Sequence, residues 1–213
     1  MSLILHEMLM GFKTSVPVSS GTTNTLEGSA WNGSLFAIVG TSGTILTSPD
    51  GTAWTTRTSA ATTNLNCVIW NGSFFVAVGN NGNIVTSPDG ITWTKRTTAV
   101  TTTITAIAWN GAIFVNVGAL GYIMTSTDAV TWTTRASSAS PGNSLSDVTW
   151  NGSFFITVGL TGRILTSPDG ITWTARTSGK TTTLRDITWN GSLFVVVGST
   201  GLILLSPDGI AWA

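Results

Sequence analysis

The sequence predicts an all-β fold, a five-bladed β-propeller, from three observations. First, the dipeptide Trp-Asn recurs five times, with steps of 39, 39, 41 and 39 residues, and a second tryptophan recurs with the same steps. Second, each unit contains four short segments with the composition of β-strands. Third, turns rich in Asn, Gly and Pro separate these segments. Four antiparallel strands per unit of a tandem array are typical of propeller blades.

The second unit shows the expected strands in order. Residues 64–70 (NLNCVIW) form the first strand, and the following Asn-Gly pair is typical of a two-residue hairpin of type I′. Residues 73–79 (SFFVAVG) are almost wholly apolar, as in a strand buried on both faces. A third strand over 83–87 (NIVTS) precedes a Pro-Asp-Gly turn, in which proline fixes φ and glycine supplies positive φ. Residues 91–97 (ITWTKRT) form the outer strand.

The repeats divide the chain into an apolar N-terminal arm at 1–10 and a single propeller domain at 11–213. We expect the blades near residues 26–61, 65–100, 104–139, 145–180 and 184–213. The last repeat reaches only the start of its fourth strand, and residues 11–20 (GFKTSVPVSS) loosely match a fourth strand. The sequence therefore predicts that residues 11–20 supply the outer strand of the last blade and close the ring, which removes an open sheet edge.

The composition excludes several classes of function. Charged residues make up 8% of the chain, and nine basic and nine acidic residues cancel. A neutral surface of this kind releases few counterions from a phosphate backbone, which argues against nucleic acid as a partner. The single cysteine forms no intramolecular disulfide, and we expect no metal and no cofactor. We read neither a signal peptide nor a membrane span in the sequence, and expect the protein in a cytoplasm or on a virion surface.

Five of the nine acids recur in one turn, which reads Ser-Pro-Asp-Gly in four of its five copies. A short acid in a tight turn accepts hydrogen bonds from backbone N–H groups that the turn leaves unpaired. The motif resembles the Asp-box, or BNR repeat, of sialidase-type β-propellers, in a form one residue shorter than usual. The resemblance implies a structural role for the acid and for the tryptophan that follows it. The residues concerned are Asp50, Asp89, Asp128, Asp169 and Asp208, with Trp54, Trp93, Trp132, Trp173 and Trp212.

One copy of the box departs from the pattern. Ala129 follows Asp128 where the other four copies have glycine, so we expect a different turn there. The resemblance also implies that a ligand site would lie on the face of the disc opposite the boxes. Such boxes occur in enzymes, lectins and assembly factors alike, so the motif indicates a fold rather than a function.

Few groups remain for catalysis once the box acids are set aside. Asp147 and Asp186 occupy equivalent positions in adjacent blades, on strands that line the central channel. A glycosidase would need two carboxylates across the scissile bond, and this pair is the candidate. The alternative, which we favour, is that the two acids bond to channel water or to neighbours such as Arg185. We therefore predict no catalytic residue and no enzyme.

Binding is expected where the repeats vary, because recurring positions build the frame. The variable positions lie in the second turn and at the start of the third strand, on the face away from the boxes. The candidate ligand residues are Thr44, Asn80, Asn81, Asn83, Tyr122 and Arg163. Their hydroxyl and amide groups suit sugar hydroxyls or a protein partner.

Three functions remain open after this reading. The first is a non-enzymatic binding or structural module, such as a virion or phage surface protein that binds a host glycan. The second is a free multivalent lectin. The third is an assembly scaffold, because the repeat rhythm also resembles the propellers of photosystem II assembly factors. We expect a glycan or protein partner and docking through the apolar arm at Leu3–Met10. The oligomeric state stays open.

Overall fold

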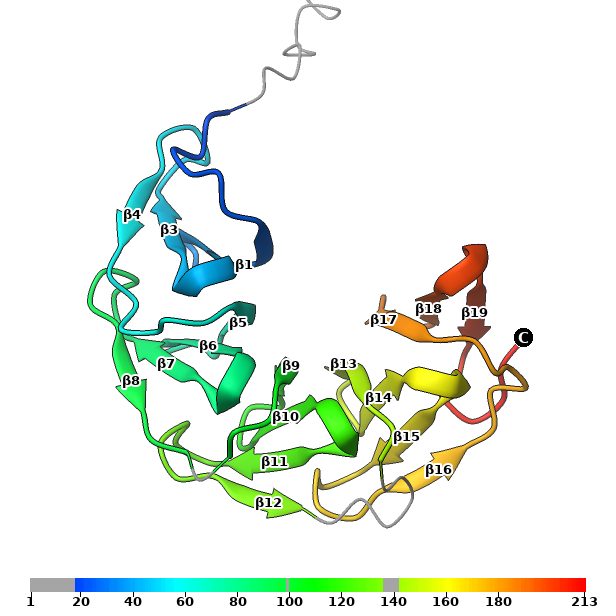
Figure 1. Cartoon of the computed structure of the whole chain (residues 1–213). Helices are drawn as coiled ribbons and strands as arrows, with labels where there is room; N and C mark the ends of the chain where they lie inside the picture. Colours follow the sequence, from blue (N-terminus) through cyan, green and yellow to red (C-terminus); the bar gives the residue numbers. More distant parts are fainter. Residues whose placement is uncertain (1–17, 99, 136–141) are drawn as a thin grey trace, which may run out of the picture.

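A computed structural model describes residues 18–98, 100–135 and 142–213. These residues form five antiparallel sheets, numbered here as blades one to five in chain order (Figure 1). The all-β prediction and the five repeat units are confirmed. Each sheet follows the order of the sequence, so within a blade every strand pairs with the strand that follows it along the chain.

The strand bounds repeat from blade to blade. Blade one contains β1 (Leu26–Trp31), β2 (Phe36–Gly40), β3 (Ile45–Ser48) and β4 (Thr55–Arg57). Blade two contains β5 (Leu65–Trp70), β6 (Phe75–Gly79), β7 (Ile84–Ser87) and β8 (Thr94–Arg96). Blade three contains β9 (Ile104–Trp109), β10 (Phe114–Gly118), β11 (Ile123–Ser126) and β12 (Thr133–Arg135). Blade four contains β13 (Leu145–Trp150), β14 (Phe155–Gly159), β15 (Ile164–Ser167) and β16 (Thr174–Arg176). Blade five contains β17 (Leu184–Trp189), β18 (Phe194–Gly198) and β19 (Ile203–Ser206).

Single 3₁₀ turns join the second and third strands of every blade. They are η1 (Thr41–Gly43), η2 (Asn80–Gly82), η3 (Ala119–Gly121), η4 (Leu160–Gly162) and η5 (Ser199–Gly201). The middle residue of each turn has a left-handed backbone, although none of the five is glycine. The turn repeats because the same Gly-x-x-Gly spacing ends the second strand in every unit.

The first hairpin differs from the predicted two-residue turn. Trp70 pairs with Phe75, so the loop of blade two contains four residues. The Asn71 Oδ1 atom closes it by accepting the N–H groups of Ser73 and Phe74, at 2.9 and 2.8 Å. Only the glycine at position 72 has positive φ. The predicted type I′ turn is therefore wrong, because the asparagine side chain satisfies the backbone donors instead.

The core lies between consecutive blades. Val76, Val78 and Ile84 of blade two form one buried cluster with Ile104 and Phe114 of blade three. The other three junctions are built from the residues at equivalent positions. Each blade therefore contributes an apolar face in both directions, which explains why the second strand of each repeat is apolar throughout.

The blades lie along an open arc, with a gap between blade one and blade five (Figure 1). Among the described residues, the sheet of blade five has three strands. Residues 11–17 of the predicted closing strand, and the arm at Leu3–Met10, lie outside the described residues. Residues 18–20 form no strand. The predicted closure of the ring is therefore not shown, and it stays a prediction.

Candidate functional site

The five box turns tie their carboxylates to the backbone. Asp89 Oδ1 accepts the N–H groups of Ile91 and Thr92, both at 2.8 Å, and the hydroxyl of Ser87. Ser87 Oγ in turn accepts the N–H of Gly90 at 2.8 Å. These bonds favour the charged carboxylate, so the pKa of Asp89 lies below its usual value, with the Thr92 N–H as the largest cause.

The other four box acids make equivalent bonds. In Asp50 the pKa falls to about 2, and the Thr52 N–H is the largest cause. The pKa values of the remaining three acids are also lowered by backbone N–H bonds; they are Asp128, Asp169 and Asp208. A carboxylate held ionised by fixed donors is a poor proton donor at neutral pH, which leaves these acids with a structural role in the turn.

The aspartate of blade three accepts the same hydrogen bonds as in the other boxes, contrary to the expectation from Ala129. Val130 and Thr131 donate to Asp128 Oδ1 at 2.8 Å, as in the other boxes. Ala129 adopts the left-handed conformation, with φ of 58°, that the glycines adopt elsewhere. The hydrogen bonds of the turn therefore override the steric preference of alanine.

The box tryptophans lie against the phenylalanine that starts the second strand. The Phe75 and Trp93 ring centroids are 6.0 Å apart, and Trp93 Nε1 donates to the Gly90 carbonyl at 2.9 Å. Trp173 repeats this bond to Gly170. Together the acid, the glycine carbonyl and the ring fix the box loops of blades one, two and four, whereas Trp132 and Trp212 make no such bond.

The second turns and the interblade linkers meet on the other face. An added Cβ at Gly43 would lie 2.0 Å from the carbonyl oxygen of Ala61, in the linker that follows the same blade. An added Cβ at Gly82 would meet the carbonyl oxygen of Val100 in the same way, and one at Gly162 would meet that of Lys180. The linkers therefore run back over the second turns, as the sequence analysis expected of this face.

Two of the candidate ligand residues are part of the frame rather than of an open surface. Thr44 is buried and accepts a hydrogen bond from Asn24 Nδ2 at 2.7 Å. Asn83 is buried and donates to the hydroxyl of Thr63. Both side chains fasten the start of the third strand to the linker that precedes their blade, so neither presents a free group to a ligand.

The remaining candidates do not converge on one site. Asn80 Oδ1 accepts a hydrogen bond from Asn66 Nδ2 at 3.0 Å, while the exposed Asn81 stands at the tip of η2. Tyr122 lies on the next blade, and its hydroxyl is 2.8 Å from Thr134 Oγ1. Arg163 lies on blade four, where the structure does contain a pocket.

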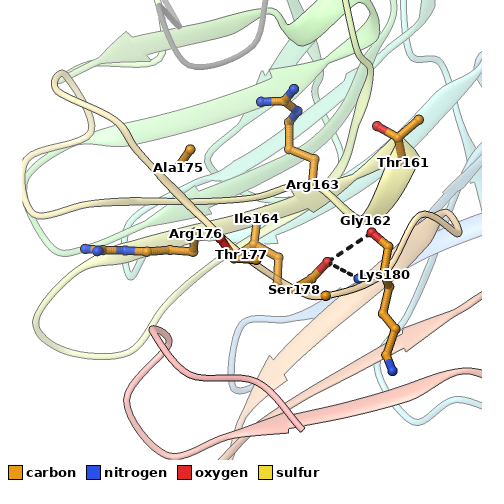
Figure 2. A pocket seen from close by; sticks show the side chains of 10 residues that line it. Thr161, Gly162, Arg163, Ile164, Ala175, Arg176, Thr177, Ser178 and Lys180 are labelled. Atoms are coloured by element: carbon orange, nitrogen blue, oxygen red, sulfur yellow. Dashed lines mark hydrogen bonds between the residues drawn. The ribbon is translucent and has the colours of Figure 1, made fainter.

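The pocket of blade four has a volume of about 300 Å³ and is lined by residues 161–164 and 175–180 (Figure 2). Its walls include Arg163, Arg176 and Lys180, three of the nine basic residues of the chain. The hydroxyl of Ser178 folds the linker by bonding to the N–H and carbonyl of Lys180. Arg163 and Lys180 point to opposite sides of the pocket in Figure 2, so the basic groups flank it rather than meet.

Sequence reasoning missed Arg176 and Lys180. Blades one to three carry an arginine at the position of Arg176, and Arg176 donates to Thr166 Oγ1 at 2.9 Å, so it belongs to the frame as well. Lys180 stands at the linker position that Ala61 and Val100 occupy in other units. The signal was available: blade four alone replaces neutral residues by bases both in its linker and at the start of its third strand.

The central channel brings the two predicted acids together. A space of about 280 Å³ is lined by the first strands of all five blades and contains Glu27, Asp147, Arg185 and Asp186. Asp147 Oδ2 accepts the N–H of Ile187 at 3.0 Å. The pKa of Asp147 is raised to about 7, with burial as the largest cause and the hydrogen bond to the Asp186 carboxyl as the next. Asp147 therefore keeps its proton to a much higher pH than an exposed aspartate does.

The sequence analysis named Arg185 as a possible partner of these acids, but Arg185 does not pair with them. Its Nε atom donates to Ser199 Oγ at 3.3 Å, toward the second turn of its own blade. The two carboxyls interact directly, whereas the paired acids of glycosidases stand about 5–9.5 Å apart. Within the described residues, no group of three or more His, Cys, Asp or Glu side chains is placed to hold a metal ion.

Comparison with known proteins identifies the fold. No family model and no curated protein matches the sequence. A solved structure titled "YCF48 bound to D1 peptide" is similar over 92% of this chain and 68% of that chain, with 16% identity and a TM-score of 0.69. YCF48 from Cyanidioschyzon merolae is similar over 95% and 75%, with 15% identity and a TM-score of 0.71.

A third similar structure is a nidogen/laminin complex, with 12% identity, a TM-score of 0.68 and coverage of 86% of this chain and 76% of that chain. These likenesses show a β-propeller fold and nothing beyond it, because the identities are low. Among the described residues, no helix has the length and apolarity that a membrane crossing requires.

Proposed function

We propose that the protein is a non-enzymatic, protein-binding propeller that holds an acidic peptide segment at the pocket of blade four. The observation that carries the proposal is the gathering of Arg163, Arg176 and Lys180 around one cavity in a charge-poor chain. Guanidinium and ammonium groups bind carboxylates by charge-assisted hydrogen bonds. The residues that line this pocket include no acid, although Arg176 also lines another pocket together with the box acid Asp208.

The comparisons support a protein partner over a glycan. The titles of two similar structures name a bound D1 peptide and a laminin complex, which are protein partners of those proteins. The assembly-scaffold reading therefore has more support than the lectin or virion readings, which stay predictions. The absence of an enzymatic role is part of the proposal, supported by the box acids bound to backbone donors and by the direct contact between Asp147 and Asp186.

The test uses a fluorescein-labelled peptide of Glu and Gly with a free C-terminal carboxylate, and measures its anisotropy as protein is added. Lys180→Ala and Arg163→Asn each install a residue that another blade carries at the same position, so the fold is preserved. We expect each variant to weaken binding roughly tenfold, because each removes one charge-assisted contact.

The matched control is Lys95→Ala, which removes an equal charge from an exposed position on β8 of blade two. It should leave the affinity unchanged at moderate salt, since screening limits exposed charges to short range. Equal losses in Lys95→Ala and Lys180→Ala would show attraction by overall charge only. A lack of binding by the unmodified protein would overturn the proposal.

A further inference from the structure

The two ends of the arc carry the two halves of the interface that joins the blades. At the four internal junctions, one valine and one isoleucine from the leading blade are buried, with 0–1% of each side chain exposed. These pairs are Val39 and Ile45, Val78 and Ile84, Val117 and Ile123, and Val158 and Ile164. Blade five presents the equivalent Val197 and Ile203 at 41% and 61% exposure. This face of blade five is therefore built like an internal face, but no neighbour covers it among the residues that the structure describes.

A sequence change makes the free face of blade five more apolar than the internal ones. Leu205, which is 42% exposed, stands where the other blades have threonine. In those blades the threonine hydroxyl accepts the Nε–H of the arginine on the fourth strand, as Thr166 does from Arg176. Leu205 offers no such acceptor, and its exposure adds to an apolar surface that water covers unfavourably.

Blade one presents the complementary face. Leu26 is 37% exposed, whereas its equivalents in the other four blades are 0–1% exposed: Leu65, Ile104, Leu145 and Leu184. Phe36 is half-buried, while the same phenylalanine is fully buried in the other blades. One position departs from the pattern, since Ser29 replaces the Val or Ile that the other first strands bury.

The polar parts of the junction are also divided between the two ends. At internal junctions Thr105 Oγ1 donates to the Leu145 carbonyl at 2.8 Å, and Asn66 Nδ2 donates to the Ile104 carbonyl at 2.7 Å. The equivalent donor on blade five is Arg185, and the equivalent carbonyl on blade one belongs to Leu26.

The channel acids show the same division. Asp147 accepts the N–H of Ile187 in the next blade. Asp186 is the equivalent acceptor on blade five, and it is exposed. Ser29 pairs with Ile38 in the register in which Ile187 pairs with Val196, so the Ser29 N–H is the equivalent donor on blade one.

A preformed linker precedes blade one. Ser20 Oγ donates to the Thr22 carbonyl at 3.2 Å and accepts its N–H, and Gly21 has φ of 72°. Ser178 folds the linker between blades four and five in the same way, with Gly179 at φ of 70°. Residues 18–26 thus repeat the linker that elsewhere leaves one blade and enters the next.

On blade five, no described residue covers the surface that such a linker covers elsewhere. The linker carbonyls of Ala61, Val100 and Lys180 cover Gly43, Gly82 and Gly162, each within 2.0 Å of an added Cβ. Gly201 holds the same position on blade five, with φ of 74°, and no heavy atom lies within 4 Å of an added Cβ. The Thr22 carbonyl is the group that would cover it.

We propose that blade five of one molecule binds blade one of a second copy, head to tail, with the Thr22 carbonyl of the second copy on Gly201. The four packed junctions hold the two ends of one chain apart across the gap in Figure 1, so a second molecule supplies the missing half. The contact is heterologous, because different surfaces of the two copies meet. It buries the apolar faces described above and satisfies Asp186 through a backbone N–H.

The register of the contact gives a direct test. In blade four, Ile164 pairs with Arg176. Arg176 stands eight residues before the first strand of blade five, and Val18 stands eight residues before the first strand of blade one. Val18 of the second copy would therefore pair with Ile203, with Cα atoms about 5.5 Å apart, within disulfide range. Val18→Cys and Ile203→Cys proteins, purified separately, are mixed and oxidised.

We expect a mixed disulfide dimer in this mixture. None should form when Val18→Cys is mixed with Val130→Cys, whose cysteine lies on an exposed box turn of blade three. In parallel, the mass in solution of the unmodified protein should rise above the 22.2 kDa of one chain with concentration. Gly201→Ala should abolish that rise, since its Cβ meets the incoming carbonyl. Gly111→Ala, also at a left-handed glycine with open space around it, should not.

Ile203→Lys provides a second variant with little effect on the isolated fold, because the side chain is 61% exposed. It should also abolish the rise in mass. A monomer at every concentration would overturn the proposal. If the double variant Val18→Cys/Ile203→Cys then formed its disulfide within one chain, ring closure in a single molecule would replace it.

Discussion

The aspartates of the box turns and the aspartates of the central channel carry the same group in opposite surroundings. Asp89 is exposed and accepts two backbone N–H groups, which lower its pKa. Asp147 is half-buried in the channel and faces a second carboxyl, and its pKa rises to about 7. Both kinds of acid have the same side chain. The acids that recur in all five units hold the frame, and the acids that occur in only two units are free to change protonation.

The two regions therefore respond to pH in opposite directions. A box acid has a folded-state pKa below its unfolded value, so its contribution to stability is present above the unfolded value and is lost as the pH falls. Asp147 has a folded-state pKa above its unfolded value. Its contribution is greatest below the unfolded value of about 4 and is lost as the pH rises to about 7.

The largest effect is expected from Asp147→Asn. The amide keeps an acceptor for the Ile187 N–H and donates to Asp186, but it carries no charge to desolvate. The variant should match the unmodified protein near pH 4 and exceed its free energy of unfolding by about 2–4 kcal/mol at pH 8. Urea unfolding at the two pH values measures this. Parallel stability curves for the two proteins would mean that the pKa of Asp147 is not raised in the folded protein.

A smaller effect is expected on the box side, where Asp89→Ala and Asn71→Ala make a matched pair. Each side chain caps a turn by accepting two backbone N–H groups, but only the aspartate is charged. Asp89→Ala should cost about 0.5–1 kcal/mol at pH 7 and progressively less below pH 4. Asn71→Ala should cost a similar amount at both pH values.

The two experimental conditions, about pH 7 and about pH 2.5, lie on either side of the unfolded pKa of about 4. Measuring unfolding under both conditions distinguishes the two variants. The comparison between the two kinds of acid would break down if Asp89→Ala cost as much in acid as at neutral pH. In that case the carboxyl would act by its shape and not by its charge.

Much of the fold follows from the repeat, and the details of the turns do not. The spacing of the tryptophans and the apolar second strands predict five sheets, because only an array of packed blades buries faces on both sides. The Asn-Gly pair at 71–72 predicts the wrong turn, because the asparagine side chain competes with the backbone pattern. The fourth strands are also shorter than predicted, since the box loop continues through its tryptophan.

The candidate site was harder to predict, because it depends on how the linkers cross the blades. Thr44 and Asn83 vary between repeats, which suggested an open surface, but the linkers bury both. Lys180 and Arg163 line one pocket only because the linker folds back over the second turn. Two basic residues that depart from the repeat within one unit indicate the position of the pocket. Variation at a single position does not.

The smallest effect concerns the one box that lacks glycine. Ala129 is held at φ of 58° by the bonds to Asp128, so the turn stores a steric cost that glycine would not have. Ala129→Gly should stabilise the protein by about 0.5 kcal/mol, because relief of that cost exceeds the added freedom of glycine in the unfolded chain. The reverse change, Gly90→Ala, should cost at least as much, because it adds a side chain at φ of 72° and its Cβ would also crowd the Leu35 methyl group and the Phe75 ring. Thermal unfolding of both variants tests whether backbone donors to the aspartate, and not the glycine, define the box. If Gly90→Ala were harmless and Ala129→Gly destabilising, packing beneath the turn would define it instead.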